Sequence, residues 1–343
     1  MTRVLSYNIL AGGYSFQGNG GRRVNQLTSI IRSAQPDIVG IAEATNPRMS
    51  QRPLVIEEIA ERLDMQVVKN DYAVTRHLSD YQVAVLTRLP IVHTQIHRHP
   101  NVLTTPVPEV CVEEANGQQL TVFITHLSAA FNQGWAGEHI RRREVRELLR
   151  IMAPKQGRPH LLMGDFNALA PGDPFKASFL LNYVVNLDGR YTKDPEATEG
   201  HPYLNSVVPP RLRLFNPLLR IIPKSRLLST LFDGAASFYA PRGSIAFIRS
   251  AGYIDCYRRM NPYSWGFTCP ASAPAGRIDY IFASPELTDR LTASYVITAG
   301  EGLPGNDASD HLAVLAEFGE KVKPEEEEKS TMPTAEPDEE VKI

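Results

Sequence analysis

The segment LLMGDFN at residues 161–167 combines an apolar run with a carboxylate and an amide placed two residues apart. Residues 160–163 are typical of a buried strand, which Gly164 brings to an end. In an extended chain the side chains of residues i and i+2 point to the same side, so Asp165 and Asn167 should face one region. Open α/β sheets tend to place ligand chemistry at such strand ends. The segment therefore predicts part of a functional site.

Other polar side chains are delivered by strand-like apolar runs in the same way. They are Asn8, Glu43, His126, Asp279, Asp310 and His311. Each has an ordinary explanation when taken alone, because a strand-end carboxylate often caps a turn and a histidine is often hydrogen-bonded scaffold. The recurrence of the pattern favours one shared site.

The residue types in this set suit the chemistry of phosphate esters. Carboxylates and carboxamides without cysteine favour a hard cation such as Mg²⁺ or Mn²⁺. Two histidines and the remaining carboxylates allow acid–base work near neutral pH. A metal ion would neutralise phosphate charge while a carboxylate activates water and a cation stabilises the leaving oxygen.

The elements that must position these groups alternate between short apolar runs and amphipathic segments. Strands are predicted at Arg3–Tyr7, Ile38–Ala42, Gln66–Lys69, Val83–Thr87, Val110–Glu113, Leu120–Thr125, His160–Met163, Ile278–Ala283, Ala293–Thr298 and Ala313–Phe318. Helices are predicted at Arg22–Ser33, Leu54–Leu63 and His139–Met152. Strands with helices outside them predict a layered α/β protein.

The composition is that of an ordinary globular protein. The chain has 343 residues, of which 43% are hydrophobic and 22% charged. No apolar run approaches the roughly 20 residues needed to span a bilayer, and the N-terminus lacks a signal-peptide layout, so we expect a cytoplasmic protein. The three cysteines have no metal-binding spacing, and we expect reduced thiols.

Two regions differ from the body of the chain. Residues 324–343 carry a net charge of −6, which leaves +4 on the rest of a chain whose net charge is −2. We predict that the acidic tail, residues 321–343, is disordered. Residues 200–232 contain five basic residues, no acid and many large apolar ones. They suggest an insertion with one or two short amphipathic helices, which could shape a substrate cleft or touch a membrane or nucleic acid, although packing on the core is as good an explanation.

The chain resembles the endonuclease/exonuclease/phosphatase superfamily, which has the DNase I-like fold. The matching segments, in the family's order, are SYNIL, DIVGIAEA, VAVLTRLPI, THL, GDFN, RIDYIF and SDH. The resemblance spans roughly residues 3–318. It implies a four-layer α/β sandwich with two mainly antiparallel sheets flanked by helices, and an active site at one edge. The expected organisation is one domain over residues 1–320, with the insertion near 200–232.

The resemblance also implies a role for each residue of the set. Asn8 and Glu43 would help to bind Mg²⁺ or Mn²⁺, with Asp310 beside the metal. Asp165 would position or deprotonate the attacking water, and Asn167 would hold a phosphate oxygen. Asp279 would orient His311, which would act as an acid or as a stabilising cation. His126 would be the second catalytic or phosphate-contacting histidine. The family often has Gln before the metal-binding Glu, whereas Ala42 occupies that position here.

The implied activity is hydrolysis of a phosphodiester by in-line attack of an activated water, with nucleic acid as one substrate class. The first alternative is a phosphatase or phospholipase-type hydrolase of a phosphoinositide, a sphingomyelin-like lipid or a small nucleotide. The second is a non-catalytic binding protein on the same fold. The mildly basic body argues weakly against long nucleic acid, and the basic apolar insertion weakly favours a lipid headgroup or a compact substrate.

Overall fold

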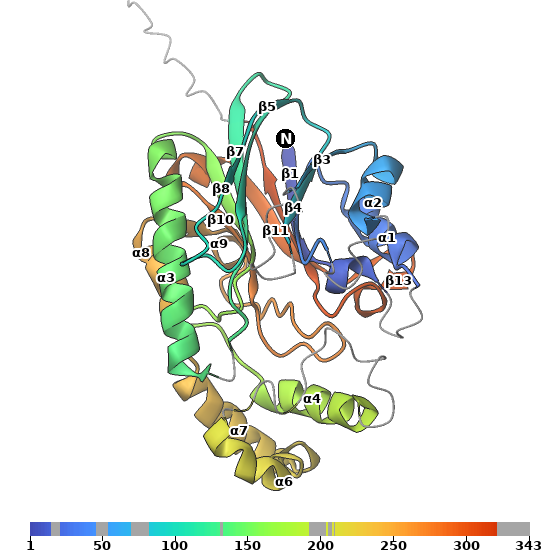
Figure 1. Ribbon diagram of the computed structural model, residues 1–343, viewed down its shortest axis with the longest axis vertical. Helices are drawn as coiled ribbons and strands as arrows, with labels where there is room; N and C mark the ends of the chain where they lie inside the picture. The colour runs from blue at the N-terminus through green and yellow to red at the C-terminus, as the bar shows by residue number, and fades with distance from the viewer. Residues whose placement is uncertain are drawn as a thin grey trace, which may run out of the picture.

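The computed structural model describes residues 1–14, 21–45, 54–69, 82–130, 133–191, 204, 208 and 210–320. Within these residues two six-stranded β-sheets pack face to face, and helices cover their outer faces (Figure 1). Each sheet contains one parallel pair, β1–β2 or β7–β8, and is otherwise antiparallel. The predicted four-layer α/β sandwich is thus confirmed.

The first sheet has the strand order β11-β14-β1-β2-β4-β3 and the second β5-β6-β7-β8-β10-β9. The strands of the first are β1 (Thr2–Asn8), β2 (Ile38–Ala42), β3 (Gln66–Lys69), β4 (Ala84–Thr87), β11 (Leu291–Ile297) and β14 (Ala313–Phe318). Those of the second are β5 (Ile91–His97), β6 (Val107–Glu113), β7 (Gln119–His126), β8 (His160–Asp165), β9 (Ile254–Asp255) and β10 (Asp279–Ala283). A short ribbon of β12 (Ala299–Gly300) and β13 (Leu303–Pro304) lies beside α1.

The helices flank the sheets because the central strands are apolar on both faces. The first sheet is covered by α1 (Val24–Ala34) and α2 (Val55–Leu63), and the second by α3 (Trp135–Met152) and α8 (Gly243–Ser250). On β1, Val4 belongs to the core between the sheets, whereas Leu5 packs under α1 and α2. This alternation gives three stacked apolar cores, which is why these strands read as continuous hydrophobic runs.

Strand direction brings the predicted site residues of the first sheet to one edge. The parallel strands β1 and β2 end at Asn8 and just before Glu43. Strand β14 is antiparallel to β1, so its beginning, two residues after His311, lies at the same edge. The N-terminus is at the opposite end of β1 (Figure 1).

The second sheet brings its polar groups to the same edge by register. Strands β7 and β8 are parallel and pair His126 with Asp165 at their final residues. Strand β10 is antiparallel to β8 and pairs its first residue, Asp279, with Asp165. Three polar residues therefore lie side by side on three neighbouring strands.

A helical unit lies beyond this edge of the sandwich (Figure 1). It consists of α4 (Ala177–Tyr191), short helical turns over residues 210–224 that include α6 (Asn216–Leu219), and α7 (Arg226–Tyr239). Its own apolar core contains Leu181, Val184 and Ile222. The helices predicted within residues 200–232 are present, but the unit extends beyond that range on both sides. Residues 200–203, 205–207 and 209 and the predicted disordered tail lie outside the described residues.

Among the described residues the remaining α-helix, α9 (Cys256–Met260), follows β9 directly. No helix in the described part of the chain is long and apolar enough to cross a membrane. All three cysteines are free thiols.

Candidate active site

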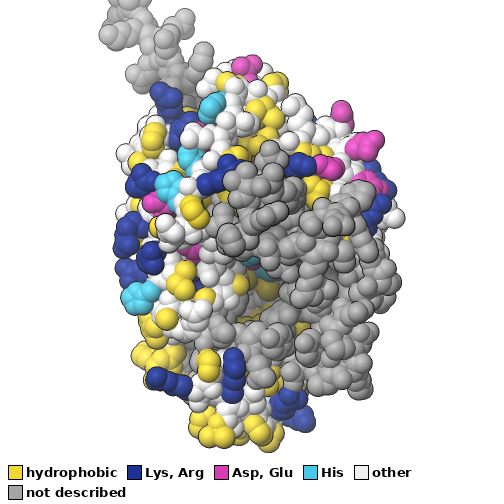
Figure 2. Space-filling model, in the orientation of Figure 1, with side chains coloured by type: hydrophobic (Ala, Val, Ile, Leu, Met, Phe, Trp, Pro, Cys, Tyr) yellow, Lys and Arg dark blue, Asp and Glu magenta, His cyan; other side chains and the backbone are white. Residues whose placement is uncertain are grey.

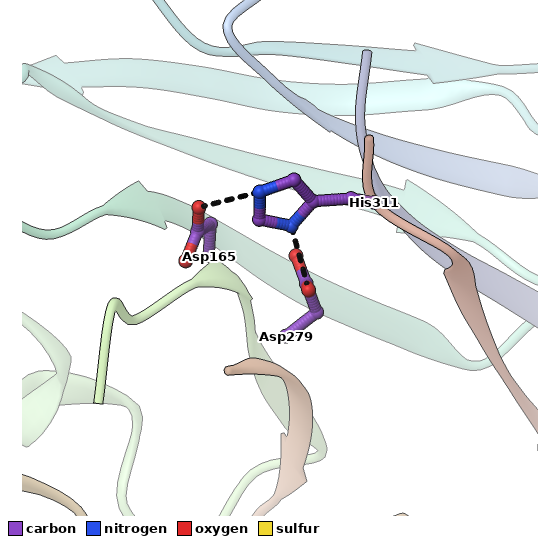
Figure 3. Close-up of side chains that lie close together, drawn as sticks. All are labelled: Asp165, Asp279 and His311. Atoms are coloured by element: carbon purple, nitrogen blue, oxygen red, sulfur yellow. Dashed lines mark hydrogen bonds and ion pairs between the residues drawn. The ribbon is translucent and has the colours of Figure 1, made fainter. Parts of the chain in front are cut away.

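His311 lies between two carboxylates at the sandwich edge (Figure 3). Its Nδ1 is 2.9 Å from Oδ2 of Asp279, and its Nε2 is 3.7 Å from Oδ2 of Asp165. The three side chains are almost inaccessible, with exposed fractions of 6%, 1% and 2% for His311, Asp279 and Asp165. The short contact from Nδ1 fixes the ring so that Nε2 faces Asp165, as a histidine–aspartate pair does in general acid–base sites.

Neighbouring hydroxyls hold the two segments that carry this pair. Ser309 donates from its hydroxyl to the backbone oxygen of Asn8 at 2.7 Å and accepts from the backbone N–H of His311 at 3.3 Å. The hydroxyl of Thr268 accepts from the backbone N–H groups of Ile278 and Asp279. The SDH segment is thus anchored to the end of β1, and the RIDY segment to the loop that contains Thr268.

Electrostatics give His311 and Asp165 different protonation preferences. Burial by itself lowers the pKa of His311, but the charge of Asp279, together with Cys269 and Asp165, raises it well above its ordinary value. Burial raises the pKa of Asp165, and the charge of His311 opposes that change. The site therefore holds a cationic imidazole beside a carboxylate that binds protons more readily than an exposed one.

Asn8 connects the two sheets through hydrogen bonds from its side-chain amide. Its Nδ2 donates to Oδ2 of Asp165 at 3.0 Å and to Oε1 of Glu43 at 3.2 Å. Its Oδ1 accepts from the backbone N–H of Leu10 at 3.0 Å and retains a second lone pair. Glu43 also accepts from the backbone N–H of Ala11 at 2.8 Å. The amide of Asn8 thereby sets the spacing between Glu43 and Asp165.

The GDFN turn gives Asp165 a fixed orientation. Its Oδ1 accepts from the backbone N–H of Asn167 at 2.8 Å, and Asn167 donates from Nδ2 to the backbone oxygen of Leu127 at 2.8 Å. The Oδ2 of Asp165 faces Asn8 and His311. It also lies 3.6 Å from the Nε2 of His126. Asp165 is therefore the group on which the other predicted catalytic residues converge.

Asp310 directly precedes His311, and its carboxylate acts on a different charged group. Burial lowers the pKa of the Arg23 guanidinium to about 10. The negative charges of Asp310 and Glu43 oppose that change. Arg23 donates to the backbone oxygens of Ile9 and Leu10 and contacts that of Ala308. It thus fastens the loop after β1 to the turn before Asp310. Sequence reasoning missed Arg23, because no local pattern marks it.

A second buried arginine, also missed, supports the RIDY segment from behind. Arg277 is fully buried and forms a bidentate pair with Asp255, at 2.7 and 2.6 Å. Its Nε donates to Asp173 at 2.8 Å, and Asp173 also pairs with Arg258. This ion network fixes the residue two positions before Asp279. The quoted motif contains Arg277, but its partners lie far away in sequence.

Gly164, the residue before the last one of β8, is required by close backbone packing. Its φ is +141°, and a Cβ atom would lie 1.9 Å from the backbone oxygen of Thr125. We expect Gly164→Ala to lower the free energy of unfolding by at least about 2 kcal/mol, measured by urea denaturation, because the main chain must move. Gly157→Ala is the control, since Gly157 has φ +76° but no atom within 4 Å of its would-be Cβ. Equal losses in the two variants would contradict the steric explanation.

The polar atoms at this edge fit a divalent cation. Asn8, Glu43 and Asp310 offer oxygen donors, which hard cations prefer. Among the described residues, ligand atoms of Asp165, Asp279 and His311 also lie within 4.8 Å of one another. The Oδ1 atom of Asp279 is buried without a hydrogen-bond partner in the described structure. The Nδ1 of His311 already binds Asp279, so only its Nε2 faces the open part of this cluster.

The two-sheet sandwich with this cluster at one edge is the DNase I-like architecture. The sequence matches the endonuclease/exonuclease/phosphatase family over residues 5–311, and the chain belongs to that family. Members of this family hydrolyse phosphoester bonds. A sequence comparison with curated proteins finds no significant match.

Solved structures share the fold at low sequence identity. An AP endonuclease from Archaeoglobus fulgidus is 14% identical, with a TM-score of 0.57, and the match covers 93% of this chain and 99% of that one. An endonuclease/exonuclease/phosphatase from Beutenbergia cavernae is 18% identical, with a TM-score of 0.55 and coverage of 93% and 72%. The 3′ phosphatase NExo from Neisseria, solved with a product DNA hairpin, is 16% identical, with a TM-score of 0.54 and coverage of 93% and 100%.

Proposed function

We propose that the protein is a divalent-metal-dependent phosphodiesterase. The observation that carries this proposal is the convergence of Asn8, His126 and His311 on one oxygen of Asp165. A scaffold that only binds a ligand would not need a buried base beside a cationic imidazole. The family's known chemistry supports the same class of reaction.

Each residue has a defined task in the proposed reaction. Asp165 orients a water and takes its proton as the water oxygen bonds to phosphorus in line with the leaving oxygen. Cationic His311, held by Asp279, stabilises the negative charge on phosphate and supplies a proton as the bond to the leaving oxygen breaks. His126 and Asn167 contact the remaining phosphate oxygens.

Glu43, Asn8 and Asp310 would hold the metal in this proposal. When bound, Mg²⁺ or Mn²⁺ supplies positive charge against the phosphate oxygens. The all-oxygen donor set and the position of Glu43, linked to Asp165 through Asn8, support this assignment.

Metal removal tests the proposal. We expect EDTA to lower hydrolysis of bis-p-nitrophenyl phosphate by at least about 100-fold, and added Mg²⁺ or Mn²⁺ to restore it. Glu43→Gln should weaken the response to metal, whereas Glu113→Gln, at an exposed position on β6, should leave it unchanged. Full activity of dialysed protein in EDTA would contradict metal dependence. A parallel screen of DNA, RNA, nucleotides, inositol phosphates and phospholipids identifies the substrate class.

A further inference from the structure

Helix α7 is apolar on both its inner and outer faces. Its inner face contributes Leu228 and Phe232 to the core of the helical unit. Its outer face exposes Leu227, Leu231 and Phe238, with exposed fractions of 69%, 62% and 83%. Their spacing of four and seven residues forms one stripe along the helix. An amphipathic helix needs only its inner face to be apolar, so the exposed stripe of α7 is not required for packing the helical unit.

The neighbouring turns continue this apolar surface. Leu214, Leu218 and Ile221, from residues 210–224, are exposed by 83%, 54% and 50%. We call these residues and the α7 stripe the apolar end of the helical unit. Such a concentration of large exposed apolar side chains marks an interaction surface.

Positive charge surrounds the apolar end. Arg211, Arg213, Arg220, Lys224 and Arg226 lie in the same stretch, and residues 200–232 contain no acid. The acid of α7, Asp233, is turned inward, where it accepts from the backbone N–H of Ser178 at 2.7 Å and lies 3.7 Å from Lys176. Figure 2 shows hydrophobic side chains at the lower end of the molecule flanked by Lys and Arg.

The combination of apolar and basic groups selects among the surfaces that could cover this end. A second copy would place like charges together, which costs free energy. A nucleic acid would satisfy the basic residues but would leave Leu227, Leu231 and Leu214 without apolar partners. An anionic bilayer satisfies both, because its headgroups attract the basic residues and its acyl region accepts the apolar ones.

We propose that the helical unit docks the protein on an anionic phospholipid surface. An open cavity of about 560 Å³, which Leu218 of the apolar end helps to line, supports this occupant. It lies between α4 and α7 and is lined by apolar residues, among them Leu180, Val184, Leu219 and Phe232. A cavity of this size and lining suits part of an acyl chain.

Docking places the catalytic edge near the lipid headgroups, because the helical unit lies beyond that edge of the sandwich (Figure 1). The substrate would then be the phosphodiester of a lipid headgroup. This part of the inference rests on the proposed phosphodiesterase function. The membrane contact itself does not depend on catalysis, so the two can fail separately.

Vesicle sedimentation of the full-length chain tests the docking. We expect binding to phosphatidylcholine vesicles that contain about 30% phosphatidylglycerol and much weaker binding to phosphatidylcholine alone. The combined variant Leu227→Ser, Leu231→Ser and Phe238→Ser should weaken binding by roughly tenfold for each side chain. Replacing Arg211, Lys224 and Arg226 by glutamine should weaken it by roughly fivefold for each charge and reduce its sensitivity to salt.

Val92→Ser is the matched control, because Val92 is a half-exposed apolar residue on β5, away from the helical unit, and its replacement should not change vesicle binding. Hydrolysis of soluble bis-p-nitrophenyl phosphate should be the same in the triple serine variant and the wild type. Normal hydrolysis without vesicle binding by the wild type overturns the docking and leaves the phosphodiesterase proposal standing. Vesicle binding by a wild-type protein that hydrolyses no phosphodiester overturns the phosphodiesterase proposal and leaves the docking standing.

Two other outcomes would assign the apolar end to a different occupant. Binding of DNA in preference to vesicles, lost in the glutamine variant but not in the serine variant, overturns the docking in favour of nucleic acid. A wild-type dimer in gel filtration that becomes a monomer in the serine variant overturns it in favour of a second copy of the chain.

Discussion

Replacing His311 by alanine is expected to lower kcat for bis-p-nitrophenyl phosphate by about 10³-fold while the protein stays folded. The Nε2 of His311 lies 3.7 Å from Oδ2 of Asp165, and Asp279 holds the ring in place at 2.9 Å. In the proposed reaction, its loss removes both a proton donor and the charge that stabilises the phosphate in the transition state. Steady-state kinetics with saturating Mg²⁺ measure the effect, and KM should change much less than kcat.

Controls separate this chemical role from a structural one. His139→Ala, on the exposed side of α3, should keep wild-type activity. Urea denaturation of His311→Ala reports whether the two buried acids left behind destabilise the fold. Wild-type kcat in a folded His311→Ala protein would exclude His311 from the reaction and would place the site elsewhere.

Asp279 should act through His311, and a double-mutant cycle can show this. We expect Asp279→Asn to reduce kcat by about 10²-fold, and to add little when His311 is already alanine. The reason is that Asp279 contacts His311 with Oδ2, while the reacting groups face the opposite ring nitrogen. Additive losses in the cycle would instead give Asp279 an independent role, for example at a metal ion.

The strands and the candidate site were predictable because both leave local signals. β2, β3 and β14 match the predicted bounds at both ends, since each is a short apolar run with clear termini. The polar residues that follow such runs meet because strand direction and register bring strand ends together. In contrast, β5 was not predicted, because its residues are mostly exposed and polar, as an edge strand allows.

The support behind the site could not be read from local patterns. Arg23 contacts backbone oxygens that lie far from it in sequence, such as that of Ala308. Arg277 pairs with Asp255 and Asp173, which are 22 and 104 residues away. Such contacts depend on the tertiary fold, and the sequence shows only an arginine beside an apolar run. Helix α4 was not predicted from the sequence, because its apolar residues do not lie on one face of the helix.

Replacing Arg277 by methionine is expected to lower the free energy of unfolding by about 3–5 kcal/mol. Asp255 would lose both of its short contacts to the guanidinium, and Asp173 would lose its contacts to Nε and Nη2. Removing one partner of a buried pair leaves an uncompensated charge, which costs more than the pair contributes when intact. Total stabilities of domains are about 5–15 kcal/mol, so this single change should be visible as a large drop in the urea midpoint.

The exposed pair of Arg62 and Glu58 on α2 gives the comparison. Arg62→Met should change stability by less than about 1 kcal/mol, because solvent screens that pair. A loss of similar size in Arg62→Met and Arg277→Met would mean that an unpaired charge costs no more in the buried network than at the surface.

A second variant distinguishes unpaired charge from lost packing at Arg277. Asp255 also caps α9 by accepting from the backbone N–H of Arg258, and asparagine can serve as a cap at that position. Combining Arg277→Met with Asp255→Asn removes the stranded charge but keeps the cap, so part of the lost stability should return. If the double variant is no more stable than Arg277→Met, the guanidinium acts mainly through its packing on Tyr280, whose ring centroid lies 4.4 Å from it. Since Tyr280 and Arg277 flank Asp279 in sequence, either result links the stability of the fold to the segment that carries Asp279.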